Sequence, residues 1–144
     1  MTPHPIDARQ KRDLSDRLAA EHLPTDDLAD TAAEFFAFHD PQGAPIGFAG
    51  LEMLGEVALL RSVVIVPGAR GRGLGAAIVR AMIAVAAKRG VKELFLLTTA
   101  AAPFFAKLGF RPIERPEAPA PIASTREFAA LCPASAIVMR RRTA

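Results

Sequence analysis

Residues 60–76 join an apolar, β-branched run to a glycine-rich turn, and this feature constrains the fold of the chain more than any other. The run Val63 to Val66 ends at Pro67, and Arg70 to Gly75 (RGRGLG) then opens a pattern of helical spacing. A helix that begins there presents free backbone N–H groups and the positive end of its dipole. Glycines let the backbone approach a ligand closely, and the two arginines add positive charge. The stretch therefore predicts a strand, a turn and a helix that hold a pyrophosphate.

Length and composition narrow the class of protein. The 144 residues, of which 51% are hydrophobic, are enough for one domain with a core and few for two. We expect a single domain over residues 1–144. No apolar run is long enough to span a bilayer, and residues 1–22 lack the apolar core of a secretory signal. The single cysteine excludes an internal disulfide and fits a reducing compartment, so we expect a cytoplasmic protein.

Charge and aromatic content argue against several kinds of partner. The formal net charge is only +3, and the chain has no Trp or Tyr on which bases could stack. Three scattered histidines and one cysteine form no recognisable metal site. We therefore expect no nucleic-acid partner, no membrane partner and no metal.

Hydrophobic periodicity predicts a mixed α/β fold with a twisted mixed sheet and flanking helices. An amphipathic helix is expected over 7–21, followed by an antiparallel meander of strands at 34–39, 46–53 and 57–66. A crossover helix over 74–89 then leads to a strand at 92–98 that is parallel to 57–66. The remaining expected elements are a helix at 103–108, a strand from 110 to 113, a helix that opens with the capping-box spacing of residues 124–127, and a strand at 135–140.

The glycine-rich turn has two other interpretations. Gly71-x-Gly73-x-x-Ala76 also fits a dinucleotide-binding fingerprint. That fingerprint requires a turn tight against its strand and an acidic residue at the end of the next strand. Here three residues separate Pro67 from Gly71, and Glu93 precedes the next strand. The second alternative is a purely structural turn with two solvated arginines.

The spacing Arg70-x-x-Gly73-x-Gly75, directly after Val63-x-Ile65-x-Pro67, resembles the acetyl-CoA signature of the GNAT superfamily of N-acetyltransferases. The resemblance implies the GNAT fold and acetyl-CoA as cosubstrate. It also implies that backbone groups of Val63 and Ile65 bind the pantetheine and the acetyl carbonyl, and that amides of the turn bind the pyrophosphate. The implied cofactor contacts are Val63, Val64, Ile65, Arg70, Gly71, Arg72, Gly73, Leu74, Gly75, Ala76 and Phe105.

A second segment, Phe104 to Phe110 (FFAKLGF), resembles the other GNAT signature. Many members of the superfamily carry there a Tyr that protonates the CoA thiolate, but this chain has Phe105 at that position. The acid is therefore left open among several candidates. These are Cys132, Ser124, Thr98, Thr99 and a water molecule. A CoA thiol has a pKa close to that of cysteine, about 8.5, so the thiolate can also leave without a protein acid.

The acceptor site is predicted from position. Many members of the superfamily place a catalytic Glu where this chain has Leu59. Glu52 on the neighbouring strand is therefore the candidate base. Burial of Glu52 would raise its pKa toward the range that a base requires. The alternative for Glu52 is a solvent-facing strand residue. Arg61 could clamp a substrate carboxylate with help from Ser62, unless it points to solvent. The further candidates for lining the acceptor site are Thr98, Thr99 and Arg126.

Three longer phrases, after Gly50, look like the small GNAT proteins associated with bacterial arsenic-resistance operons. They are GLEMLGEVALLRSVVIVPGARGRGLGAAIV, ELFLLTTAAAPFFAKLGF and STREFAALCPASAIVM. The resemblance implies a small-molecule amine as acceptor, such as an amino acid or an organoarsenical analogue. A peptide N-acetyltransferase and a non-catalytic CoA-binding regulator remain the alternatives. We expect a monomer or a homodimer.

Overall fold

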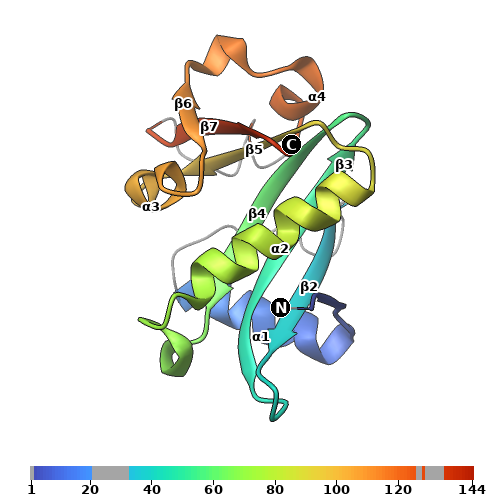
Figure 1. Cartoon of the computed structure of the whole chain (residues 1–144), viewed down its shortest axis with the longest axis vertical. Helices are drawn as coiled ribbons and strands as arrows, with labels where there is room; N and C mark the ends of the chain where they lie inside the picture. Colours follow the sequence, from blue (N-terminus) through green and yellow to red (C-terminus); the bar gives the residue numbers. More distant parts are fainter. Residues whose placement is uncertain (1, 21–32, 126–127, 129–134) are drawn as a thin grey trace.

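The computed structural model describes residues 2–20, 33–125, 128 and 135–144 (Figure 1). Its sheet of seven strands has the order β1-β2-β3-β4-β5-β7-β6. The strands are β1 (His4–Pro5), β2 (Ala33–His39), β3 (Pro45–Leu54), β4 (Val57–Ile65), β5 (Glu93–Thr98), β6 (Arg111–Ile113) and β7 (Ile137–Arg142). The helices are α1 (Ala8–Ala20), α2 (Leu74–Lys88), α3 (Ala102–Ala106) and α4 (Ala120–Ala123), and two 3₁₀ turns are η1 (Pro67–Ala69) and η2 (Arg115–Glu117).

The topology confirms the expected meander and crossover. Strands β2, β3 and β4 pair antiparallel, and β4 pairs parallel with β5 after the chain has crossed through α2. The last strand, β7, lies between β5 and β6 and is antiparallel to both. The fold class deduced from periodicity is therefore correct.

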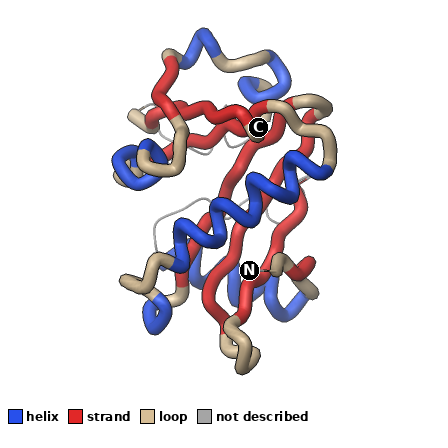
Figure 2. The backbone as a smooth tube through the Cα atoms, viewed as in Figure 1, coloured by secondary structure: helices blue, strands red, loops and turns tan. Residues whose placement is uncertain are grey.

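The two faces of the sheet are covered by different helices, as Figure 2 shows with α2 in front of the strands and α1 behind them. On one face α2 contributes Ile78 and Met82 to the largest apolar cluster. The opposite face carries two smaller clusters. In the first, Leu14 and Leu18 of α1 lie with Phe35, Ala37, Phe48 and Val64. In the second, Ile122 of α4 lies with Leu59 and Phe95.

Local sequence explains where the two long helices begin and end. Asp7 precedes α1, and its carboxylate accepts the Gln10 N–H at 2.8 Å while the Gln10 side chain accepts the Asp7 N–H at 3.0 Å. This reciprocal pair satisfies donors that the first turn leaves free. The α2 helix begins after Gly73, and Gly90, with φ of +85°, lies just beyond its end.

A short helix, α4, spans Ala120–Ala123 in the region after β6. Most of the helix predicted to open at Ser124 lies outside the described residues, and Phe128, the described residue within it, is helical. Pro121 lies in the first turn of α4, where the missing N–H of a proline costs nothing. The Thr125 hydroxyl donates to the Ile122 carbonyl at 2.8 Å and accepts the Phe128 N–H at 3.2 Å. Arg126 and Cys132 lie outside the described residues.

None of the described helices is both long and apolar enough to cross a bilayer. Within the same described residues, no three His, Cys, Asp or Glu side chains are grouped closely enough to hold a metal ion.

Candidate active site

The strands β4 and β5 pair over only part of their length. The parallel ladder joins Val57–Leu59 to Glu93–Phe95, whereas β4 continues to Ile65 and β5 to Thr98. Beyond the ladder the two strands diverge, as Figure 1 shows. Both strands are described in full, so the backbone of β4 beyond Leu59 has no partner in β5 on that side. An extended ligand can therefore bond to β4 there as an additional strand would.

A β-bulge lies in the diverging part of β4. Phe48 pairs with Val64 and Gly50 with Arg61, so β4 has one more residue than β3 between the two pairs. Ser62 occupies the bulge with φ of +58°, and it is the only described residue other than glycine with a positive φ. A non-glycine residue pays about 1–2 kcal/mol for this conformation. Bulges bend a strand and redirect its side chains, which accounts for the departure of β4 from β5.

The glycine-rich turn has the geometry that an anion requires. Gly71 and Gly73 adopt left-handed backbone conformations, with φ of +80° and +70°. The N-cap of α2 is Gly73, which has no side chain to cap the helix. The first turn of α2 contains no acidic residue. The first N–H groups of the helix are thus available to a ligand, and the helix dipole favours a negative one. The residues present fit a pyrophosphate.

Both arginines of the turn are exposed and bonded to nearby carbonyls. Arg72 donates to the Gly68 carbonyl at 3.1 Å, which braces the turn. Arg70 donates through Nε to the Ile65 carbonyl at 3.2 Å. The Ile65 carbonyl was expected to be available to the pantetheine, so a ligand would share it with Arg70 or displace that side chain.

Two adjacent phenylalanines of α3 have different environments. Phe105 is 8% exposed and packs edge-on against Phe104 and Phe110, with ring centres 5.0 and 5.8 Å away. Phe104 is 38% exposed, and its Cζ lies 3.4 Å from the position that a Cβ at Gly75 would occupy. Sequence reasoning missed Phe104. The signal was Gly75, because a glycine inside the first turn of a helix indicates a close neighbour.

Glu52, Arg61 and Ser62 lie together on the face opposite α2, and we call them the polar strip. Glu52 pairs directly with Leu59, so the two side chains share a face of the sheet. Leu59 packs with Phe95 and with Ile122 of α4, and we call these three residues the α4 cluster. Arg61 follows two residues later on β4, and the Ser62 hydroxyl accepts its Nε–H at 3.1 Å. On β4, Arg61 and Ser62 lie between Leu59 of the α4 cluster and Val64, which packs with Leu14 and Leu18 of α1.

Arg61 is buried, with only 3% of its surface exposed, and does not point to solvent. Its guanidinium carbon lies 5.7 Å from the centre of the Phe35 ring on β2. Burial of a guanidinium is costly unless hydrogen bonds or counter-charges compensate it. The Ser62 hydroxyl and the Phe35 ring fix the Arg61 side chain in place at the bulge. Glu52 is half-buried.

The two threonines at the end of β5 lie apart from the polar strip. Thr98 is two residues beyond Leu96, which packs under α2, so its side chain is on the α2 side of the sheet. Its hydroxyl oxygen accepts the Ala101 N–H at 3.0 Å, just before α3. Thr99 is exposed. The structure thus brings Glu52, Arg61 and Ser62 together but not Thr98.

Comparison with known proteins identifies what the chain is similar to. The family model described as acetyltransferase (GNAT) family matches residues 4–110. A search of curated proteins finds no match. Many solved structures share the fold at low sequence identity.

Three of these structures illustrate the likeness. A GNAT-family acetyltransferase from Staphylococcus aureus Mu50 is 16% identical, with a TM-score of 0.79 and 99% of both chains covered. Rv2747 from Mycobacterium tuberculosis, solved with CoA and a second ligand, is 22% identical, with a TM-score of 0.80 and 99% of both chains covered. N-acetylglutamate synthase from Neisseria gonorrhoeae, solved with coenzyme A and N-acetyl-glutamate, is 18% identical at a TM-score of 0.76, and the match covers all of this chain but 34% of that one.

Proposed function

The chain belongs to the acetyltransferase (GNAT) family, whose enzymes take an acetyl group from acetyl-CoA, and we propose that its acceptor is the amino group of a small molecule that carries a carboxylate. An amino acid or an amino-acid analogue has this chemistry. The observation that carries the proposal is the burial of Arg61 on β4, the strand to which we assign the cofactor.

The proposed roles of the residues follow from their places. Acetyl-CoA supplies an activated thioester when it is bound. The amides of residues 73–76 bind its pyrophosphate, and the backbone of Val63 orients the acetyl group along β4. Arg61 holds the acceptor carboxylate from the opposite face of the sheet. Glu52, on the same face, accepts the proton that the acceptor amine loses.

Two features support a small acidic acceptor over a peptide. The positive charge of Arg61 is buried between two apolar clusters, whereas a peptide would need an extended exposed surface. One structure of similar fold, the N-acetylglutamate synthase, was solved with an acetylated acidic amino acid. The resemblance to arsenic-operon proteins adds organoarsenical amino acids to the candidate acceptors, and this association and a cytoplasmic location stay predictions.

A thiol-release assay with acetyl-CoA and a panel of amines tests the proposal. The panel contains acidic and neutral amino acids, an organoarsenical amino acid, polyamines and short peptides with free N-termini. We expect turnover with carboxylate-bearing amino acids and little with polyamines. Preference for peptides or for uncharged polyamines would contradict the proposed acceptor.

One observation favours a second candidate function, a CoA-binding regulator. Phe105 occupies the position of the proton-donating Tyr and has no proton to give. If CoA binds but no member of the panel is acetylated, the regulator is the better description. Measurable turnover with any amine excludes it, because water or another group then supplies the proton.

A further inference from the structure

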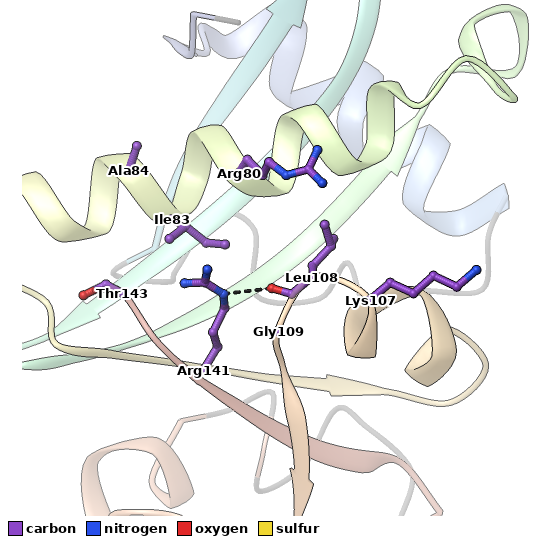
Figure 3. Close-up of a pocket in the computed structure, with 8 residues that line it drawn as sticks. All are labelled: Arg80, Ile83, Ala84, Lys107, Leu108, Gly109, Arg141 and Thr143. Atoms are coloured by element: carbon purple, nitrogen blue, oxygen red, sulfur yellow. Dashed lines mark hydrogen bonds between the residues drawn. The ribbon is translucent and has the colours of Figure 1, made fainter.

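A basic basin lies between α2, the turn after α3 and the end of β7 (Figure 3). Its volume is about 550 Å³, and it is open to solvent. Arg80 comes from α2, Lys107 from the residue after α3, and Arg141 from β7. Ile83 and Leu108 provide an apolar floor. Neither the glycine-rich turn nor the polar strip is part of this basin.

The charges of the basin have one sign. No acidic side chain is among its lining residues, and in the described part of the chain none of its three cations pairs with a carboxylate. Arg141 is held in place, since its Nε donates to the Leu108 carbonyl at 2.8 Å, as Figure 3 shows. Like charges around one basin repel each other, and a bound anion relieves that repulsion.

The basin is a short distance from the turn that fits a pyrophosphate. Arg80 follows Leu74 by six residues on α2, which is about 9 Å along the helix axis. Helical side chains tilt toward the amino end, and Figure 3 shows the Arg80 guanidinium extending in that direction. An anionic group joined to the pyrophosphate by a few bonds could therefore reach Arg80.

CoA has such a group, because the ribose whose 5′ position bears the pyrophosphate also bears a 3′-phosphate. We propose that the basin binds the 3′-phosphate of CoA through Arg80 and Lys107, so that the chain distinguishes CoA from 3′-dephospho-CoA. The proposal rests on the proposed function, because it requires CoA at the glycine-rich turn. The apolar floor suits the adenine ring attached to the same ribose.

Calorimetry with CoA and with 3′-dephospho-CoA tests the proposal. We expect the unmodified chain to bind CoA about tenfold to a hundredfold more tightly, as one or two charge-assisted hydrogen bonds would provide. The double variant Arg80→Gln/Lys107→Gln should bind both ligands with the affinity that the unmodified chain has for dephospho-CoA. Arg141 is left unchanged because it also supports the Leu108 carbonyl. Lys88→Gln, an exposed lysine on the last turn of α2 outside the basin, is the matched control and should keep the preference.

The possible outcomes separate this proposal from the proposed function. Equal affinity of the unmodified chain for both ligands overturns the role of the basin but leaves acetyl transfer intact. Binding of neither ligand overturns the proposed function. A preference that survives in the double variant assigns the 3′-phosphate to other residues and overturns the proposal. Adenosine 3′,5′-bisphosphate must compete with CoA, and simultaneous binding of the two would make the basin a separate anion site, which also overturns it.

Discussion

The guanidinium of Arg61 lies 5.7 Å from the ring centre of Phe35, although a whole strand separates the two residues. Gly50 of β3 makes this approach possible, because it pairs directly with Phe35 on one side and with Arg61 on the other. A Cβ at Gly50 would lie 2.8 Å from Cε1 of Phe35 and 3.2 Å from the Arg61 carbonyl oxygen. The aromatic ring occupies the space that a side chain at Gly50 would need.

The first prediction is that Gly50→Ala destabilises the fold by about 1–3 kcal/mol, as overpacking of a filled site does. The added methyl group forces the Phe35 ring away from Gly50 and so loosens its contact with Arg61. Urea denaturation measures the free energy of unfolding. Gly68→Ala is the control, since a Cβ there meets no atom within 4 Å. Equal stability of the two variants would contradict the packing described.

Much of the fold follows from local sequence patterns. The meander, the crossover helix and the parallel strand are each predicted by hydrophobic spacing, and the glycine-rich turn by its residues alone. These features depend on contacts between neighbours in sequence or on the burial of one face. The left-handed Gly71 and Gly73 likewise follow from residue type.

Other features depend on register between strands, and the sequence contains no local signal for them. The bulge at Ser62 arises from how β4 pairs with β3, and no turn residue marks it. The close approach of Phe35 to Arg61 requires both strand registers at once. The basic basin combines residues from α2, the turn after α3 and the end of β7 that are far apart in the chain. Near the end of the chain, the short helix α4 has no hydrophobic period to announce it, and the helix predicted to open at Ser124 lies mostly outside the described residues.

The second prediction concerns the two phenylalanines of α3. Phe105→Ala should cost about 3–5 kcal/mol of stability, because it leaves a cavity among buried side chains. Phe104→Ala should cost clearly less, since 38% of that residue is already exposed. Chemical denaturation of both variants makes the comparison. A larger loss at Phe104 than at Phe105 would show that the burial of α3 is misassigned.

The third prediction concerns the glycine-rich turn. Gly73→Val should reduce CoA affinity strongly while the fold is retained. A Cβ at Gly73 meets no atom within 4 Å, so the penalty arises from its φ of +70° and not from a clash. A β-branched residue avoids this conformation and would reorient the first N–H groups of α2.

Gly73→Asn is the matched variant for the same turn, because asparagine tolerates the left-handed conformation. It should retain more of the CoA affinity than Gly73→Val does. Calorimetry with CoA gives both affinities. Unchanged affinity in Gly73→Val would exclude the assignment of the phosphate site.

The last prediction is for the acceptor. Arg61→Lys should lower kcat/KM for a carboxylate-bearing acceptor about a hundredfold, which corresponds to the loss of a bidentate charged contact worth a few kcal/mol. Lysine retains the positive charge in a buried position but cannot present two parallel donors. CoA affinity should not change, because Arg61 is on the face opposite α2. Arg111→Lys, an exposed arginine on β6, is the control and should retain full activity. The same loss with an acceptor that lacks a carboxylate would mean that Arg61 supports the site without binding the substrate.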